Sequence, residues 1–489
     1  MRFLLLMLAW LIAVPALADP RAPDLVLRGQ ITGVDHQTYK PVAFEVPAGV
    51  TRLTIVFDHT GQDQKTVVDL GLLDAERFRG WSGGNKTEFT LATEDATPSF
   101  LPGPIRPGRW TLLLGIPNAR PTTVATFEAK VFFDRRDLGQ GFTAAPLAGP
   151  GWYRGDLHMH TAHSDGSCPS QSGARVPCPV YRTAQAAAAR GLDFIAITDH
   201  NTTAQYEAMR ELQPAFDRLL LIPGREITTF QGHANVFGPT ADIDFRLGDP
   251  AVPDIKSLAR AVAKAGGLMS INHPALPSGE ICMGCGWTAA NTDGTLFGAV
   301  EIINGGAVRA SGGSAEGPLS GVPFWETRLN AGLHLTGVGG SDNHDASLPA
   351  TTPGAVGSPT TVVHAQALST PAIVQGLREG RVFVDLDTAP DHRLDLHATR
   401  GDQTADMGGR LTAGAGEVVT FVVQVAGVTD GRVEVVRDGK VAAVDLIATA
   451  DPQARLFKIV STGRRGWVRV NVRAVDGRLL MIGNPIYLN

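Results

Sequence analysis

The middle of this chain repeats one pattern that limits the folds it can adopt. A stretch with helical periodicity ends at a glycine and is followed by an apolar run and then by a polar loop. Such pairs of helix and strand are predicted at residues 180–190 and 192–198, 254–265 and 268–271, 322–331 and 334–338, and 370–379 and 381–385. Repeated helix and apolar strand are typical of β/α units with a parallel sheet, so we predict the α/β class for this region.

Polar side chains follow three of these strands directly. The groups are Asp199 with His200, Asn272 with His273, and Asp342 with His344. In closed parallel β/α architectures the C-terminal ends of the strands meet on one face, where active sites are built. We therefore expect side chains that are far apart in the sequence to converge on one point.

Histidines and carboxylates are concentrated in the same region. Eight of the 13 histidines fall between residues 158 and 344, and most stand beside carboxylates in short motifs. Imidazole nitrogens and carboxylate oxygens together bind Zn, Mn or Fe. We predict a centre with more than one divalent metal ion. The candidate ligands are His158, His160, Asp165, His200, Glu226, His233, His273, Asp342 and His344.

In this order the motifs resemble those of the PHP (polymerase and histidinol phosphatase) metallohydrolases, over about residues 150–385. Residues 152–160, 232–235 and 484–488 are similar to the CehA/McbA branch, which includes carbaryl hydrolase. The resemblance implies a distorted (β/α)7 barrel with two or three ions of Zn, Mn or Fe. It implies that His158, His160, Glu226 and Asp342 hold one ion, that Glu226 bridges to a second held by His233 and His273, and that Asp165, His200 and His344 complete a third position.

Four further residues near these motifs have two interpretations each. Asp199 either accepts the free N–H of a ligand imidazole or caps the turn that follows it. His163 is a candidate proton shuttle or substrate contact, and a hydrogen-bonded loop histidine explains it equally well. Glu301, near the end of a predicted strand, either faces the site or forms a structural salt bridge. Arg309 lies in a glycine-rich segment and is either part of a lid over the substrate or a solvated loop residue.

The flanking regions have a different pattern. At 489 residues the chain is too long for one hydrophobic core, so roughly two to four domains are expected. Short runs with period-two alternation, separated by turns, precede and follow the central region and favour β-sandwiches. We predict an N-terminal β-sandwich over residues 19–148, the metallohydrolase domain over 149–390 and a C-terminal β-sandwich over 391–489.

The N-terminus is typical of a secretory signal peptide. Arg2 precedes an apolar run over residues 3–14, and Ala16-Leu17-Ala18 ends the segment in the manner of a cleavage site. About a dozen apolar residues are too few to span a bilayer, so we expect no membrane anchor. We predict cleavage after Ala18 and a periplasmic or secreted location.

The four cysteines are Cys168, Cys178, Cys282 and Cys285. In an exported protein two disulfides are the default, and four cysteines allow three pairings. Proximity favours Cys168–Cys178 and Cys282–Cys285, while a cross-link between the two loops stays open. A zinc site formed by all four thiolates is the competing interpretation, although the first pair lacks the short spacing of such sites.

The net charge of the chain limits the kinds of molecule that it is expected to bind. The net charge is −5, it becomes −6 when the signal peptide with Arg2 is removed, and there is no Lys/Arg stripe. We therefore expect no extended nucleic-acid surface. The leading hypothesis is an exported hydrolase that cleaves phosphoesters in a small-molecule substrate. Carbamate or carboxylic-ester hydrolysis, nuclease activity and a non-catalytic glycan-binding role in the cell envelope are the alternatives, and the sequence leaves the oligomeric state open.

Overall fold

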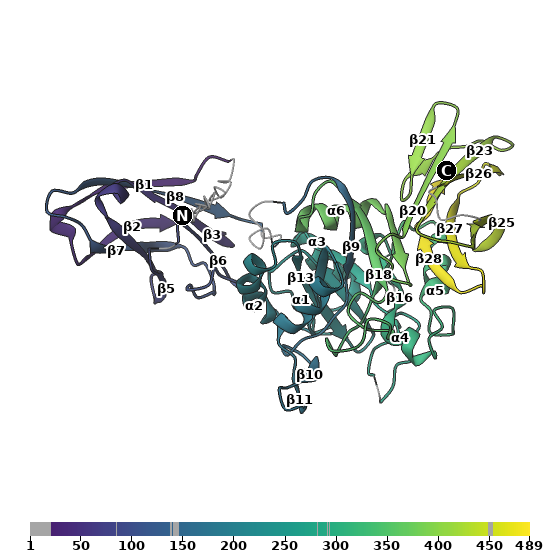
Figure 1. Ribbon diagram of the computed structural model, residues 1–489, viewed down its shortest axis with the longest axis horizontal. Coiled ribbons are helices and arrows are strands. Elements are labelled where there is room, and N and C mark those ends of the chain that lie inside the picture. The colour runs from purple at the N-terminus through teal and green to yellow at the C-terminus, as the bar shows by residue number, and fades with distance from the viewer. Residues whose placement is uncertain are drawn as a thin grey trace, which may run out of the picture.

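The computed structural model describes residues 21–84, 86–136, 139, 146–280, 282–290, 292, 294–447 and 453–489. The predicted signal peptide over residues 1–18 lies outside the described residues, so its cleavage and the location of the protein stay predictions. Figure 1 shows an N-terminal β-sandwich at one end, a central α/β region, and a C-terminal group of strands beside it. No helix among the described residues has both the length and the hydropathy to cross a membrane.

Two four-stranded antiparallel sheets form the N-terminal sandwich. One sheet has the order β1 (Leu25–Thr32), β8 (Val124–Asp134), β3 (Arg52–His59) and β6 (Glu88–Ala92). The other has the order β2 (Thr38–Val46), β7 (Gly108–Asn118), β4 (Val67–Leu73) and β5 (Phe78–Ser82). Alternate side chains such as Leu53, Ile55, Leu112 and Leu114 point inward and share one core between the sheets.

A buried ion cluster lies between this sandwich and the central region. Asp95 has no exposed surface, and its carboxylate accepts hydrogen bonds from Arg52 of β3 at 3.0 Å and from Arg210 of the central region at 2.6 Å. Burial raises the pKa of Asp95, but the two guanidinium groups outweigh burial and hold it below its ordinary value. Because one carboxylate serves two arginines from different parts of the chain, the cluster ties the parts together.

The central sheet has both parallel and antiparallel neighbours. Its strands are ordered β17 (Thr336–Gly340), β16 (Ala299–Asn304), β15 (Leu268–Ile271), β14 (Gly232–Phe237), β13 (Leu220–Thr229), β12 (Phe194–Ile197), β9 (Gly151–Asp156), β18 (Thr360–Ala365) and β19 (Val382–Asp385). Strands β9, β12 and β13 are mutually parallel, as are β15, β16 and β17. Strand β14 runs antiparallel between the two groups, and β18 runs antiparallel to both β9 and β19. The prediction of a parallel sheet was therefore wrong at β14, β18 and β19.

The expected distorted (β/α)7 barrel is not confirmed, because among the described strands the sheet stays open between β17 and β19. Both edges of β19 are already paired, one with β18 and the other with β28 of the C-terminal region. Side chains bridge the seam instead: Thr361 of β18 bonds the backbone N–H and C=O of Gly339 at 2.8 and 2.7 Å. Asn484 likewise accepts from Gly337 at 2.7 Å and donates to Val382 at 2.8 Å. The strands thus curl around a core without closing their hydrogen-bond ladder.

Six helices are described in the central region: α1 (Val180–Ala189), α2 (Gln205–Leu212), α3 (Ile255–Lys264), α4 (Gly305–Ala310), α5 (Val322–Asn330) and α6 (Thr370–Glu379). The helices expected over residues 254–265 and 370–379 are confirmed. Asp254 caps α3 by accepting from Ser257 N at 2.7 Å, and Gly380 ends α6 with φ of 75°. The buried face of α3, with Ile255, Leu258 and Val262, packs toward the sheet.

The C-terminal strands continue the central sheet. Strands β28 (Leu479–Gly483), β27 (Gly466–Ala474), β24 (Gly431–Arg437) and β25 (Lys440–Ile447) extend it beyond β19, and β29 (Ile486–Leu488) pairs with β22 (Arg410–Leu411) and β27. A second sheet of β21 (Gln403–Asp406), β20 (Arg393–Arg400), β23 (Val418–Ala426) and β26 (Gln453–Val460) packs on this extension. Val362 and Phe383 share a core with Val468 and Val470, so sheet and core both run across the domain boundary predicted at residue 390.

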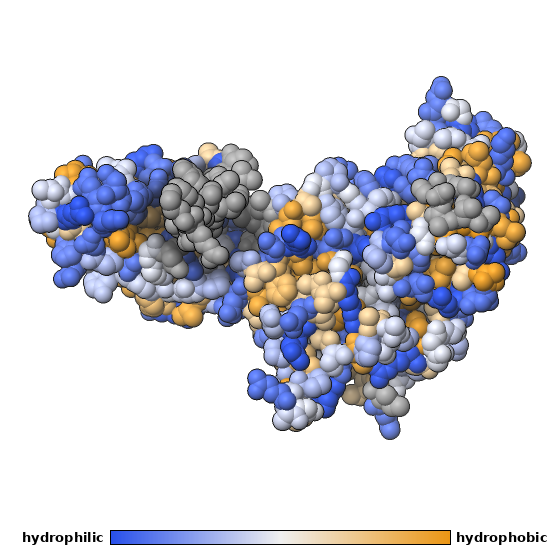
Figure 2. Space-filling model, in the orientation of Figure 1, coloured by the Kyte–Doolittle hydropathy of each residue, from blue (hydrophilic) through white to orange (hydrophobic). Residues whose placement is uncertain are grey.

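The surface is mixed in character. Figure 2 shows hydrophilic and hydrophobic residues interspersed over most of the visible face, with orange residues gathered at the C-terminal end. There, Val441, Val444 and Leu446 of β25 are exposed. A few exposed apolar side chains on one edge strand are within the ordinary apolar share of a protein surface.

The structure contains the disulfides Cys168–Cys178 and Cys282–Cys285. This is the pairing that proximity favours, and it excludes a zinc site formed by all four thiolates in this state. The first disulfide joins the short hairpin of β10 (Ser167–Pro169) and β11 (Arg175–Pro177) to the start of α1. The second closes a tight loop after β15.

Candidate metal centre

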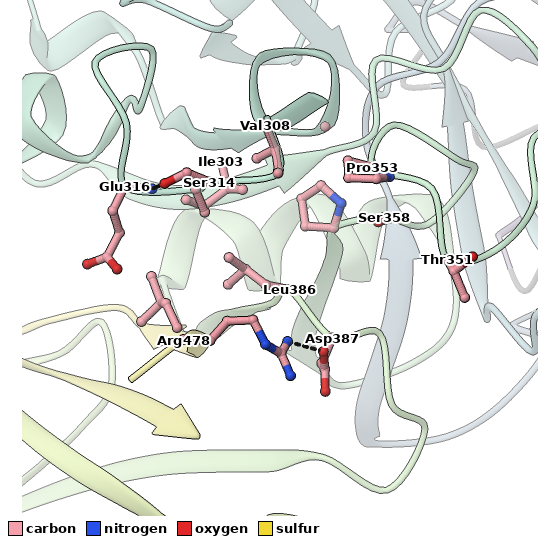
Figure 3. A pocket seen from close by; sticks show the side chains of 15 residues that line it. Ile303, Val308, Ser314, Glu316, Thr351, Pro353, Ser358, Leu386, Asp387 and Arg478 are labelled. Carbon is pink, nitrogen blue, oxygen red and sulfur yellow. Dashed lines mark hydrogen bonds and ion pairs between the residues drawn. The ribbon is translucent and has the colours of Figure 1, made fainter. Parts of the chain in front are cut away.

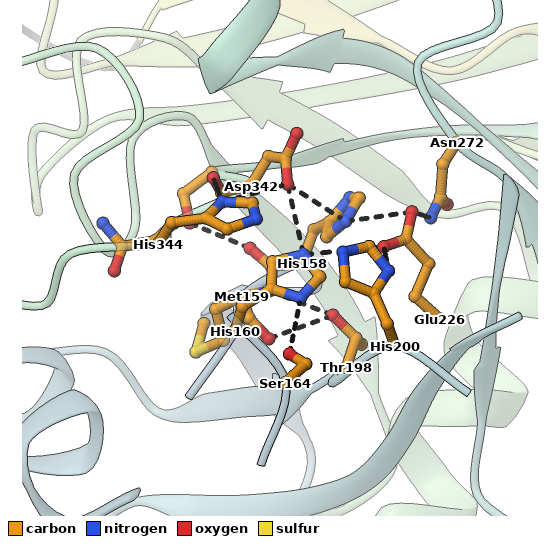
Figure 4. Close-up of polar contacts among 12 residues, drawn as sticks. His158, Met159, His160, Ser164, Thr198, His200, Glu226, Asn272, Asp342 and His344 are labelled. Carbon is orange, nitrogen blue, oxygen red and sulfur yellow. Dashed lines mark hydrogen bonds and ion pairs between the residues drawn. The ribbon is translucent and has the colours of Figure 1, made fainter. Parts of the chain in front are cut away.

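The nine predicted ligands lie together at one edge of the central sheet. Loops after β9, β12, β15 and β17 carry seven of them, Glu226 lies within β13, and His233 opens the antiparallel strand β14. Figure 4 shows His158, His160, His200, Glu226, Asp342 and His344 facing one another although they come from four separate segments. The convergence expected from the loops after parallel strands therefore occurs, even though the sheet is not a closed barrel.

Backbone contacts hold the first and last of these segments side by side. Met159 forms a parallel bridge with Asn343, and the N–H of His160 donates to Asn343 O at 2.8 Å. Asp156 has no exposed surface and accepts from Ser341 N at 2.9 Å and from Gly357 N at 2.6 Å. Burial raises the pKa of Asp156, and these donors act against that rise. The pairing brings the His158-Met159-His160 segment against the loop that carries Asp342 and His344.

Glu226 is at the middle of the cluster. Five imidazole nitrogens approach its carboxylate: His200 Nδ1 at 2.9 Å, His233 Nδ1 at 3.3 Å, His273 Nε2 at 3.3 Å, His158 Nε2 at 3.4 Å and His160 Nε2 at 3.5 Å. The residue is 1% exposed. Burial raises its pKa, but the surrounding imidazoles outweigh burial and hold the pKa well below its usual range. An ionised carboxylate with ligand atoms on both of its oxygens has the geometry of a bridge between two cations.

One candidate position lies among His158, His160 and Asp342. Asp342 Oδ1 is 3.3 Å from His158 Nε2 and 3.2 Å from His160 Nε2, and the three donor atoms lie within 4.8 Å of one another. Both imidazole nitrogens are buried without a hydrogen-bond partner. A buried polar atom without a partner is costly, and a cation at this point would satisfy both nitrogens at once. The donor set therefore fits a divalent metal ion.

A second candidate position lies at Glu226 Oε1, the oxygen that His158 Nε2 also approaches. His233 Nδ1 and His273 Nε2 both face its Oε1 atom at 3.3 Å, and His233 Nδ1 is buried without a hydrogen-bond partner. The backbone of His273 has φ of 23°, and that of Asp342 has φ of 52°. Residues other than glycine rarely adopt such angles, and they tend to be found where structure serves function.

The third group is more open to solvent. Asp165 Oδ1 is 3.4 Å from His344 Nε2, 3.7 Å from His200 Nε2 and 3.8 Å from His160 Nδ1. The side chains of Asp165 and His344 are 56% and 40% exposed, whereas those of His158 and His160 are fully buried. This group is where a substrate from solvent would meet the cluster.

Glu301 and Asn304 belong to the site, which settles the choice left open for Glu301. Glu301 Oε1 is 2.9 Å from His158 Nδ1, and its Oε2 accepts from the backbone N–H of His273 at 2.8 Å. Asn304 donates to Glu301 Oε2 at 3.0 Å and to Asp342 Oδ2 at 3.3 Å. A carboxylate behind a ligand imidazole fixes the ring so that its other nitrogen faces the metal.

The side chains of the two predicted catalytic residues, Asp199 and His163, make no described contact with the candidate ligands. Asp199 has no exposed surface and accepts from Thr161 N at 2.7 Å, Thr161 Oγ1 at 2.7 Å and Ser164 Oγ at 2.6 Å. It thus shapes the loop that carries His160 and Asp165, instead of accepting an imidazole N–H directly. The only contact described for His163 is its backbone N–H to Thr161 Oγ1 at 3.3 Å. The described contacts give the His163 ring no link to the cluster.

The charge state of His344 yields a prediction about pH. Burial lowers the pKa of His344, but Asp165 and Asp342 outweigh it and raise the pKa from 6.5 to about 9. In the metal-free protein this raised pKa contributes stability that is fully present below pH 6.5 and is lost as the pH rises through about 9. A metal ion must displace this proton, so affinity at the third group is expected to rise about tenfold per pH unit in that window. Metal titrations between pH 6.5 and about 9 measure this rise in affinity. The His344→Asn variant lacks the titrating imidazole, so its metal affinity should depend much less on pH.

Two cavities lie near the cluster. One of about 560 Å³ has Asp342 and His344 in its wall together with Arg175 and Arg309, and therefore opens onto the ligands. The other, of about 310 Å³, lies between α4 and the turn after β19, where Arg478 forms an ion pair with Asp387 (Figure 3). The wall of this second cavity includes none of the nine candidate ligands. The first cavity is the candidate substrate pocket.

Comparison with known proteins finds similarity among solved structures. No family model matches the chain, and no curated protein matches it. It is similar to a solved two-domain protein containing a predicted PHP-like metal-dependent phosphoesterase from Bacteroides vulgatus ATCC 8482, with 18% identity, 70% of this chain and 97% of that one covered, and a TM-score of 0.37. It is also similar to a provisionally assigned metal-dependent phosphoesterase from Bifidobacterium adolescentis ATCC 15703, with 17% identity, coverage of 41% and 91%, and a TM-score of 0.29. Both scores are below 0.5, so we infer the function from this chain's own side chains.

Proposed function

We propose that this chain is an exported, metal-dependent phosphoesterase of the PHP type. The observation that carries the proposal is the ionised, buried carboxylate of Glu226 with five imidazole nitrogens around it. The ligand set in PHP order and the curled sheet that carries it support the family, and similarity to the carbaryl-hydrolase branch rests on sequence alone. Residues 1–18 and two disulfides support an oxidising compartment outside the cytoplasm.

The residues present would hold two or three divalent ions in the arrangement described above. When bound, such ions supply a hydroxide nucleophile at neutral pH and stabilise charge on the ester oxygens. Glu301 keeps the Nδ1 atom of His158 engaged, so that its Nε2 atom faces Glu226 and Asp342. Asp199 fixes the loop that carries His160 and Asp165 through Thr161 and Ser164. The site is thus positioned by buried hydrogen bonds before any ligand arrives.

The candidate substrate pocket favours an anionic substrate. Arg175 and Arg309 line it beside Asp342 and His344. Arg175 is paired with Asp345, whereas no ion pair is described for the exposed guanidinium group of Arg309. An arginine without an acidic partner beside candidate metal ligands suits the oxygens of a phosphoryl group, which accept two parallel hydrogen bonds from guanidinium. A neutral carbamate would leave this charge unused.

The proposal is tested with the chain lacking residues 1–18, supplied with Zn or Mn, against aryl phosphate monoesters, aryl phosphate diesters and naphthyl carbamates. We expect turnover of a phosphoester that is lost with a chelator and restored by metal. Turnover of the carbamate alone would replace the phosphoesterase with a carbamate hydrolase. Metal binding without turnover of any class, together with glycan binding, would support the non-catalytic alternative.

Arg309→Ala provides an internal check on substrate class. Loss of even one hydrogen bond to a charged group costs about 1.5–3 kcal/mol, so KM for the phosphoester should rise at least about tenfold. Arg309→Lys keeps the charge and should recover part of the affinity. Turnover of a carbamate by the same variant, if present at all, should not change, and an unchanged phosphoester KM would remove Arg309 from substrate binding.

A further inference from the structure

The loop Cys282–Cys285 contacts the far side of two candidate ligands. His233 Nε2 is 3.3 Å from the backbone oxygen of Met283, and His273 Nδ1 is 3.1 Å from the backbone oxygen of Cys285. These are the ring nitrogens that point away from Glu226, whose Oε1 atom faces His233 Nδ1 and His273 Nε2 at 3.3 Å. Two carbonyl groups from one four-residue loop therefore stand behind both imidazoles of the second position.

These contacts decide which nitrogen of each ring can bind a metal. A carbonyl oxygen only accepts, so each of the two far nitrogens must carry the proton. The near nitrogens are then left with free lone pairs, and His233 Nδ1 is buried with no other partner. An acceptor behind a ligand imidazole fixes its tautomer and orientation, and its loss typically reduces metal affinity about 10- to 100-fold.

The disulfide closes the loop that carries these carbonyls. Cys282 and Cys285 are joined across a sequence separation of three residues, with their Cα atoms 5.6 Å apart. Gly284 between them has φ of 80°, and a Cβ atom at that position would lie only 2.1 Å from the backbone oxygen of Thr229. The loop thus lies directly on the end of β13, next to the turn before His233, in a conformation that favours glycine.

The two cysteine residues differ in exposure. Cys285 is 2% exposed, whereas Cys282 is half-buried and its neighbour Met283 is 68% exposed. An attacking thiolate would therefore reach the Cys282 sulfur from solvent, with the Cys285 sulfur as the leaving group.

We propose that the Cys282–Cys285 disulfide is a redox-sensitive clamp on the second metal position. This inference rests on the proposed metal centre. A dithiol reductant donates two electrons: one of its thiolates attacks the Cys282 sulfur, the sulfur of Cys285 leaves and takes a proton, and the second thiol releases Cys282 as a thiol while the reductant forms its own disulfide. Without the crosslink, the carbonyls of Met283 and Cys285 no longer stay on His233 and His273, and the second ion is held less tightly.

The test also detects a different role for Cys285, that of a metal ligand after reduction. Its sulfur lies within 4.8 Å of one ring nitrogen of each of His233 and His273, so a freed thiolate could hold an ion together with these two histidines. In that case reduction would increase metal affinity. The clamp and the extra ligand therefore predict changes in opposite directions.

The experiment compares metal affinities by chelator competition in the oxidised chain, in the chain reduced with dithiothreitol, and in the C282S/C285S variant. The matched control is C168S/C178S, which lacks the other disulfide and leaves only Cys282–Cys285 to reduce. We expect one ion to bind roughly 10- to 100-fold more weakly in the C282S/C285S variant and in the reduced control, and unchanged binding in the oxidised control. Because the reduced control needs no substitution in the loop, it decides the question even if C282S/C285S does not fold.

Cobalt spectra distinguish the remaining outcomes. A sulfur-to-cobalt charge-transfer band that appears on reduction, with tighter binding, would overturn the clamp in favour of Cys285 as a ligand. Equal affinities in all forms would overturn any role of this disulfide at the centre. If the oxidised wild-type chain binds no divalent ion, the proposed function fails, and that result is separate from a failure of the clamp alone.

Discussion

Replacement of Glu226 by glutamine is expected to abolish binding of at least one metal ion and, with it, hydrolysis. The substitution keeps the shape of the side chain but removes the negative charge that five imidazole nitrogens approach. Loss of an acceptor behind a ligand costs about 10- to 100-fold in affinity, so loss of the bridging ligand itself should cost more than about 100-fold. The number of bound ions per chain, measured by elemental analysis after dialysis, and kcat for the best phosphoester check this.

The control for this variant is Glu211→Gln, at an exposed position of α2. It removes the same charge from the same region without touching the cluster, and both metal content and kcat should stay at wild-type values. Full metal content in the Glu226→Gln variant would show that the carboxylate is no ligand. The assignment of the remaining ligands to two metal positions would then be wrong.

Asp95→Asn should destabilise the chain by about 3–5 kcal/mol, because it leaves two buried arginines facing a neutral amide. Arg52 and Arg210 are 4% and 7% exposed, so water can replace the lost charge only poorly. The ionised form of Asp95 stabilises the fold above its unfolded pKa of 3.8, and this contribution is lost as the pH falls through the lower folded value. Urea unfolding, followed by tryptophan fluorescence, measures the difference.

An exposed ion pair provides the comparison. Glu76 and Arg106 are paired with side chains that are 59% and 61% exposed, so Glu76→Gln should change stability by less than about 1 kcal/mol. Because Asp95 connects the N-terminal sandwich with α2, the Asp95→Asn variant should unfold at a lower urea concentration in both parts. A loss confined to the sandwich would show that the cluster does not couple them.

Local signals made several elements predictable. The helix over residues 254–265 has an amphipathic stripe, a capping aspartate and a glycine stop, so each end has its own physical cause. Strand β14 has no such signal, because all six of its residues are buried and no alternation marks it as a strand. The open seam could not be predicted either. It depends on the pairing of β19 with β28, which lies about 100 residues further along the chain.

The candidate metal centre likewise has residues that local sequence signals predicted and residues that they could not predict. Histidine and carboxylate motifs in a known order pointed to His158, Glu226 and Asp342 because the chemistry lies in the side chains themselves. The carbonyl groups of Met283 and Cys285 carry no residue-specific signal, since every residue has one. Glu301 was visible as a carboxylate near the end of a strand, but only the fold shows that it contacts both His158 and the backbone of His273.

The continuous pairing of β19 with β28 affects how this protein can be divided. A fragment ending near residue 390 would lose the partner of β19 and Asn484, which spans from Gly337 to Val382. Its newly bare strand edge would invite association with other chains. The final hundred residues therefore complete the sheet beside β19, and they are unsuited to exchange as an independent module.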